Sequence, residues 1–115
     1  MGSFFRRHAM EYVIAFVTTG GIEEAKKIAA ALVERKLAAG VNIIPEVLSY
    51  YWWKGKVESE VETKLVIKTK PRLMDAVIRA VKELHSYAVC EVTFVPIVGG
   101  NADYLKWIDG SVLLT

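Results

Sequence analysis

The sequence predicts an α+β domain in which an antiparallel sheet carries two helices on one face. Two stretches with apolar residues at helical spacing, 22–36 and 71–85, lie between stretches rich in β-branched and aromatic residues. The long extended region between them is divided at Gly55 into two strands, which predicts a hairpin. This order of elements is a split βαβ pattern.

The first half of the chain predicts a strand, a helix and a second strand. Residues 12–18 are nearly continuous in apolarity, which is typical of a central strand covered on both faces. From Ile22 apolar residues recur at helical spacing, with acidic residues first and basic residues last, as the helix dipole favours. Residues 41–53 form one long extended segment, in which Pro45 predicts a bulge or bend.

The second half predicts a return strand, a helix, an edge strand and a short final helix. Residues 56–68 alternate in polarity, which predicts one wet face and one face carrying Val57, Ser59, Val61, Thr63, Leu65 and Ile67. Pro71 opens the next helix, and residues 89–97 form the predicted edge strand. Asn101 caps a short helix that Gly110 stops. The result is a ferredoxin-like fold, β-α-β-β-α-β plus a short C-terminal helix, with a long hairpin between the second and third strands.

A length of 115 residues is typical of a single domain. We expect residues 10–115 to form it and residues 1–9 to be a leader or tag remnant. We expect no membrane span, because the apolar runs are far shorter than the roughly 20 residues required. A net charge of +2, with acids and bases interleaved, argues against nucleic acid as a partner. The single cysteine, Cys90, fits a reducing compartment, so we expect the cytoplasm.

The predicted hairpin carries aromatic side chains on both faces near its tip. Tyr51 and Trp53 point to one side of the strand, and Tyr50 and Trp52 to the other. A two-stranded ribbon with this much apolar surface is unstable alone in water. We therefore expect it to pack against neighbouring copies in a homo-oligomer; the alternative is that it folds back onto its own domain.

Three residues near the second helix are candidate ligands for a divalent cation. His85, Cys90 and Glu91 combine imidazole, thiolate and carboxylate donors, which suit Cu(II) or Zn(II). Their spacing matches no closed-site pattern, and the alternative is that His85 contacts the helix C-terminus while Cys90 packs as a small apolar residue. The acidic strip of the third strand is expected to pair with lysines and remain solvated; it comprises Glu58, Glu60 and Glu62.

No catalytic pattern is present in the sequence. None of the serines lies in a nucleophile-elbow sequence, and His85 is the sole credible base. We therefore expect no enzyme. Four aromatic residues are candidates for lining a pocket between subunits, or alternatively for simple packing: Trp53, Tyr87, Tyr104 and Trp107.

Several segments, taken together, resemble the CutA divalent-cation tolerance family. Residues 49–56, Ser-Tyr-Tyr-Trp-Trp-Lys-Gly-Lys, are similar to the signature hairpin of that family, and Glu62 and Lys68 fall on the same motif. The resemblance spans residues 12–108 in the right order. The other matching residues are Leu37-Ala38-Ala39, His85-Ser86-Tyr87, Glu91, Asn101, Tyr104, Trp107 and Ile108.

The resemblance implies a ferredoxin-like fold and a tight homotrimer built by the long hairpin. It also implies a role in metal-ion tolerance, with copper binding in some members, and an architecture related to trimeric PII-type signalling proteins. It adds Glu62 to the candidate metal ligands. The residues it implies for subunit contacts or a pocket are Tyr51, Trp52, Trp53, Lys68, Tyr87, Tyr104 and Trp107.

Three positions depart from the family pattern. Gly40 stands where bacterial members often have cysteine, and Ser86 and Cys90 stand where proline is usual. Because Cys90 is the only cysteine, the thiol-based metal site proposed for some relatives is not carried over.

The sequence leaves two functions open. The first is a trimeric cytoplasmic protein of divalent-cation tolerance that binds or responds to ions such as Cu(II) and requires no cofactor. The second is a PII-like trimeric module that signals or binds a small ligand at subunit interfaces, without catalysis. RNA binding ranks last, because the strand 56–68 has no aromatic residue to stack on a base.

Overall fold

The computed structural model describes residues 11–114, so the predicted leader, residues 1–9, lies outside the described part. No helix of that part is long and apolar enough to cross a membrane. The elements, in chain order, are β1 (Val13–Thr19), α2 (Ile22–Glu34), β2 (Gly40–Trp53), β3 (Lys56–Thr69), the 3-10 helix η1 (Pro71–Leu73), α3 (Met74–Leu84), β4 (Thr93–Pro96) and α4 (Ala102–Ser111).

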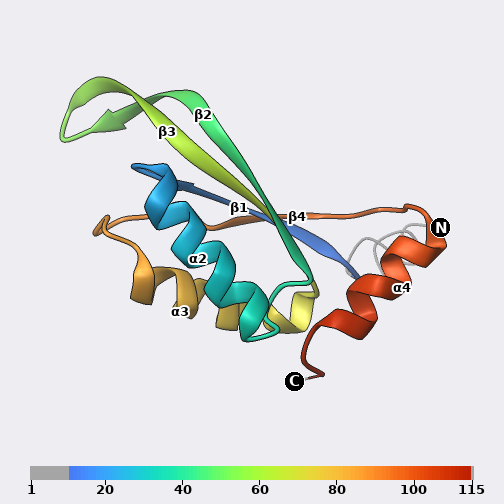
Figure 1. The fold of residues 1–115 in the computed structure, drawn as a ribbon. Coiled ribbons are helices and arrows are strands. Elements are labelled where there is room, and N and C mark those ends of the chain that lie inside the picture. Colours follow the sequence, from blue (N-terminus) through green and yellow to red (C-terminus); the bar gives the residue numbers. More distant parts are fainter. Residues whose placement is uncertain (1–10, 115) are drawn as a thin grey trace.

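The four strands form one antiparallel sheet in the order β2-β3-β1-β4. β1 pairs with β3 along its whole length, from Val13 opposite Thr69 to Thr19 opposite Thr63. Its other edge pairs with β4. α2 and α3 lie side by side on one face of the sheet (Figure 1). The ferredoxin-like α+β fold predicted from the sequence is therefore confirmed.

The hydrophobic core lies between the sheet and these two helices. Val17 of β1, Leu65 of β3 and Ile28 of α2 are completely buried there. The opposite side of β1 carries half-buried residues such as Ile14 and Phe16. The expectation that β1 is covered on both faces was therefore wrong for a single chain, because two right-handed crossovers place both helices on the same side.

The β2–β3 hairpin projects beyond the helices as a two-stranded ribbon (Figure 1). Its turn is made by Lys54 and Gly55, whose φ angles are 49° and 79°, as a tight reversal between twisted strands requires. The pairing register shifts between Ile44 and Val47. This shift confirms the bulge predicted at Pro45.

The predicted burial of one face of β3 is correct only where the helices cover the strand. Thr63, Leu65 and Ile67 are buried, but Val57 and Val61 on the same side are 60% and 57% exposed. The ribbon passes the ends of α2 and α3 before it reaches these valines. The alternation of polar and apolar residues indicates a strand, whereas the burial of each side chain depends on what packs against that face of the strand.

β4 is shorter than the predicted strand, 89–97, and pairs with β1 only over Thr93–Pro96. Its last partner on β1 is Phe16. Beyond that point the carbonyl of Thr18 accepts a hydrogen bond from Nε2 of His85 at 2.7 Å. Because this bond occupies the edge of β1, the chain before β4 forms a loop instead of a strand.

α4 begins as predicted, with Oδ1 of Asn101 accepting a hydrogen bond from the N–H of Asp103 at 3.0 Å. It ends slightly later than predicted, because Gly110 is its penultimate residue and Ser111 its last. Boundary differences of this size are ordinary at a fraying helix end.

A cluster of three side chains holds α4 against the start of β1. The hydroxyl of Tyr12 donates to Oδ2 of Asp109 at 2.7 Å, and Nζ of Lys70 pairs with Oδ1 at 2.5 Å. Nζ of Lys70 also lies 4.1 Å from the centroid of the Tyr12 ring. The bond to Asp109 raises the pKa of Tyr12 to about 12. The bond from Lys70 lowers the pKa of Asp109.

We expect stability at acid pH to depend on Asp109. Because its pKa is lowered in the folded state, its stabilisation is complete above the unfolded pKa of about 4 and is lost as the pH falls through the folded value. The melting temperature of the wild type should therefore fall more steeply with acid than that of Asp109→Asn. Thermal melts across acid and neutral pH test this, with Glu34→Gln as the control. Equal acid slopes for wild type and Asp109→Asn would contradict the prediction.

Candidate functional site

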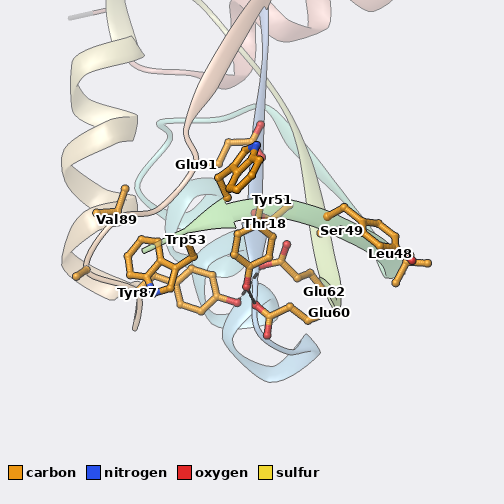
Figure 2. A pocket seen from close by; sticks show the side chains of 13 residues that line it. Thr18, Leu48, Ser49, Tyr51, Trp53, Glu60, Glu62, Tyr87, Val89 and Glu91 are labelled. Atoms are coloured by element: carbon orange, nitrogen blue, oxygen red, sulfur yellow. Dashed lines mark hydrogen bonds between the residues drawn. The ribbon is translucent and has the colours of Figure 1, made fainter. Parts of the chain in front are cut away.

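A cleft of about 800 Å³ lies between the hairpin and the loop that follows α3 (Figure 2). Its walls come from β2, β3, the end of β1 and the chain before β4. The lining residues are Thr18, Leu48, Ser49, Tyr50, Tyr51, Trp52, Trp53, Glu60, Glu62, Tyr87, Ala88, Val89 and Glu91.

The register of the hairpin gathers carboxylates and aromatic rings on one of its faces. Residues paired directly across antiparallel strands share a face. Glu62 is paired with Val47, Glu60 with Ser49, and Glu58 with Tyr51. We call this side the acidic face; it comprises Val47, Ser49, Tyr51, Trp53, Lys56, Glu58, Glu60 and Glu62.

Two tyrosines hold two of the carboxylates in the cleft (Figure 2). The hydroxyl of Tyr87 donates to Oε2 of Glu62 at 2.9 Å, and that of Tyr51 donates to Oε1 of Glu60. Burial and the bond to Glu62 raise the pKa of Tyr87. The bond to Glu60 raises the pKa of Tyr51 to about 12. Both phenols therefore remain protonated hydrogen-bond donors at neutral pH.

Glu62 is buried without a cationic partner in the described part of the chain. Its exposed fraction is 7%, and the ion pairs found in that part do not include it. Among the described residues, the cleft lining contains three glutamates and no lysine or arginine. Buried carboxylates are normally balanced by a cation. The cleft of a single chain therefore carries unbalanced negative charge.

His85 fixes the loop that carries Tyr87. The side chain of His85 is completely buried. Its Nε2 donates to the carbonyl of Thr18 at 2.7 Å, and its Nδ1 accepts the N–H of Tyr87 at 3.0 Å. This arrangement places the ring proton on Nε2 and uses both ring nitrogens. Glu24 braces the same loop, because its carboxylate accepts hydrogen bonds from the N–H and hydroxyl of Ser86.

The four predicted metal ligands are divided between the cleft and the core. Glu62 and Glu91 line the cleft. His85 lies behind it, and Cys90 is half-buried against the hydrophobic core. In the part of the chain that the structure describes, no group of three His, Cys, Asp or Glu side chains is arranged to hold a metal ion. The metal site stays a prediction, and the donors that reach the cleft are carboxylate and phenol oxygens.

Four of the residues predicted for a pocket or subunit contact line the cleft: Tyr51, Trp52, Trp53 and Tyr87. Lys68 lies elsewhere, on the helix-free face of the sheet, where its ammonium donates to Asn42 and burial lowers its pKa. Tyr104 and Trp107 lie together on α4, with ring centroids 5.3 Å apart. A Cβ placed on Gly40 would lie 3.1 Å from the Trp107 ring, so this glycine lets α4 approach the edge of the sheet.

Sequence reasoning missed Glu60, which was assigned to a solvated strip. The available signal was its position diagonal to Tyr51 across the hairpin, a spacing that long side chains can bridge. Thr18 and Val89 were also missed as cleft residues. No local pattern marks them, because only the tertiary fold brings them to the hairpin.

The comparison with protein families covers most of the chain. The family described as "CutA1 divalent ion tolerance protein" matches residues 13–111. The chain belongs to the CutA1 family. The resemblance seen in the sequence is therefore confirmed.

CutA relatives of known sequence and structure agree with this assignment. "Protein CutA 1, chloroplastic" of Oryza sativa subsp. japonica is 44% identical over 99 residues, which cover 86% of this chain and 56% of the rice protein. "Divalent-cation tolerance protein CutA" of Archaeoglobus fulgidus is 40% identical over 97 residues, covering 84% and 94%. The crystal structure of CutA1 from Oryza sativa has a TM-score of 0.89 at 41% identity, covering 94% of this chain and 99% of that one.

The match covers only part of several longer relatives. The chain spans 56% of the rice protein, 62% of a Xenopus laevis CutA homolog and 53% of mouse CutA. The common part is therefore the domain described above.

We expect Glu62→Gln to lower the pKa of Tyr87 toward the ordinary tyrosine value of about 10. The substitution removes a negative charge and weakens the hydrogen bond, whereas burial still keeps the pKa above that value. Alkaline NMR titration of ring-labelled tyrosines measures this, with Tyr12 as internal reference because its partner is Asp109. Glu46→Gln is the control variant. An unchanged Tyr87 titration would show that the carboxylate does not govern the phenol.

Proposed function

We propose that the chain is a homotrimeric, non-enzymatic divalent-cation tolerance protein that binds or responds to ions such as Cu(II) or Zn(II) in the cytoplasm. Membership in the CutA1 family supports the divalent-cation role, and relatives carry that description in their names. The free Cys90 supports a reducing compartment. The observation that supports an oligomer is an apolar face of the hairpin that remains exposed to solvent within residues 11–114.

By strand pairing this apolar face is the reverse of the acidic face, and its β2 residues Leu48, Tyr50 and Trp52 also border the cleft. It comprises three directly paired positions on each strand: Leu48 with Val61, Tyr50 with Ser59, and Trp52 with Val57. Trp52 is 74% exposed and Tyr50 is 70% exposed. Contiguous apolar surface of this kind marks an interaction site, because covering it gains about 25 cal/mol for each Å².

The shape of the chain favours a closed ring of copies. Each hairpin projects from its own domain, so it can lie on the next copy while its own domain receives the hairpin of the previous one. Such head-to-tail contacts form rings when the rotation closes. Three copies is the number that the CutA resemblance implies.

The charge of the cleft supports the metal-ion part of the proposal. Three glutamates without a basic lining residue attract cations of any kind. Glu62 and Glu91 offer oxygen donors to a divalent ion. His85 acts in this arrangement by positioning Tyr87 and not as a free donor, since both its nitrogens are hydrogen-bonded.

A second candidate function, a PII-like trimeric module that binds a small ligand, is favoured by the size of the cleft. Its volume of about 800 Å³ falls within the usual range of small-molecule sites, about 300–1,000 Å³. Its walls combine aromatic rings with a few polar groups, as such sites commonly do.

We expect Trp52→Glu to dissociate the trimer. The substitution places a charge at the centre of the apolar face, which should cost about 2 kcal/mol or more for each interface. Light scattering after size exclusion should give three chain masses for the wild type and a smaller mass for the variant. Lys56→Glu, near the same turn but on the acidic face, should remain trimeric. An unchanged mass for Trp52→Glu would exclude this face as the interface.

We expect Cu(II) calorimetry on the purified, tag-free oligomer to show a saturable site. Glu62→Gln should weaken binding about tenfold, because it removes the buried carboxylate. His85→Ala should weaken it less, through the displaced Tyr87. Glu83→Gln, an exposed position on α3, is the control. Absence of saturable heat near neutral pH in the wild type would contradict metal binding.

A further inference from the structure

The C-terminal helix is attached to the rest of the chain by little apolar contact. α4 lies at the end of the molecule opposite the hairpin tip (Figure 1). Of the ten residues described in α4, only Ile108 is buried. Ile108 and Val112 pack with Leu73 in a small cluster that is separate from the core between the sheet and the other two helices. A segment with so few buried apolar contacts opens at a lower cost in free energy than the whole domain.

The tail after α4 is held to the rest of the chain through its backbone. The N–H of Leu113 donates to the carbonyl of Lys36 at 2.9 Å. The carbonyl of Leu113 accepts hydrogen bonds from Nε and Nη2 of Arg72 at 3.1 and 2.8 Å. The bonds from Arg72 are exposed to solvent, so water can replace them when the tail detaches.

Asp109 makes the only ion pair of α4 in the described part of the chain. Its carboxylate accepts hydrogen bonds from the hydroxyl of Tyr12 and the ammonium of Lys70. Of the other charged groups nearby, Arg72 favours the ionised carboxylate and Glu11 acts on Tyr12. Protonation of Asp109 removes the charge that pairs with Lys70, whose side chain is only 13% exposed. Acid therefore weakens the attachment of α4.

α4 covers the beginning of an edge strand. β2 lies at one edge of the sheet, and the ring of Trp107 packs against its first residue, Gly40. An uncovered strand edge presents unpaired N–H and C=O groups to other chains, and proteins commonly cover such edges with a helix. Residues 97–100, between β4 and α4, belong to no helix or strand, so they can absorb the rotation that moves α4 away.

We propose that residues 101–114 form a latch that opens as one unit while the sheet, α2 and α3 stay folded, and that the Asp109 carboxylate holds this latch closed. A ten-residue helix is marginal alone in water, so the detached segment loses its helix. Opening exposes the beginning of the β2 edge. The inference goes beyond the proposed function and depends neither on the trimer nor on a metal ion.

Hydrogen exchange on the assembled protein, followed by mass spectrometry, tests the latch. The amides of α4 and Leu113 are compared with those of α2, each referred to its intrinsic exchange rate at the same pH. At neutral pH the latch amides should share one protection factor, at least about tenfold below that of α2. Asp109→Asn should lower the protection of the latch about fivefold further, and acid should add less to this loss than it does in the wild type.

Two further variants distinguish opening as a unit from fraying at the C-terminus. Arg72→Met removes the hydrogen bonds to the carbonyl of Leu113, which lies outside α4. It should nevertheless lower the protection of every α4 amide by the same factor as that of Leu113, about threefold. Asp103→Asn is the matched control, because it makes the same change as Asp109→Asn on a side chain of α4 without an ion pair in residues 11–114. It should stay within about twofold of the wild type.

Three results would overturn the inference: protection of α4 equal to that of α2, a loss confined to the last turn in Arg72→Met, or wild-type protection of α4 in Asp109→Asn. The side chains changed in these variants are exposed, so the substitutions leave the buried core intact. The α2 amides report in the same experiment whether the rest of the fold is preserved.

Discussion

The hydrogen bond between the His85 ring and the carbonyl of Thr18 determines where the sheet ends and where the cleft begins. It occupies the edge of β1, so β4 is confined to four residues and the chain before it leaves the sheet. The same ring accepts the N–H of Tyr87, which directs the phenol toward Glu62 on β3. One buried imidazole thus couples the end of the central strand to the loop after α3 and to the hairpin. Without this imidazole, the end of β1 and the loop after α3 would lose the two hydrogen bonds that hold Tyr87 toward the hairpin.

The sequence was sufficient for the fold because its signals are local. Apolar periodicity located the helices, Gly55 located the turn, Pro45 located the bulge and Asn101 located the last helix. Local signals were insufficient for the length of β4 and for burial along β3. Both depend on contacts between distant residues, such as His85 with the end of β1, which no spacing reveals.

The same distinction applies to the candidate site. Residue types singled out the aromatic hairpin tip and Tyr87, and the family resemblance singled out Glu62; the structure places these side chains together in the cleft. Residue types did not show that both ring nitrogens of His85 are hydrogen-bonded to backbone groups. Nor did they show that Glu60 joins the cleft. The type of a residue shows which donors and acceptors its side chain has. Whether these groups are free to bind a ligand depends on the neighbours that are already hydrogen-bonded to them.

The hairpin also has a kinetic consequence. Its pairing is between neighbouring segments of sequence, so it can form on the microsecond scale, before the distant pairing of β1 with β4. If the chain assembles as proposed above, a newly folded copy carries Leu48 and Trp52 in water until it meets another copy, and in that interval it is the species most prone to aggregate. The glutamates on the reverse face make two-sided stacking of ribbons unfavourable. For the proposed oligomer, the yield of native protein should therefore be set by a competition between correct association of copies and aggregation, rather than by the speed of folding within one chain.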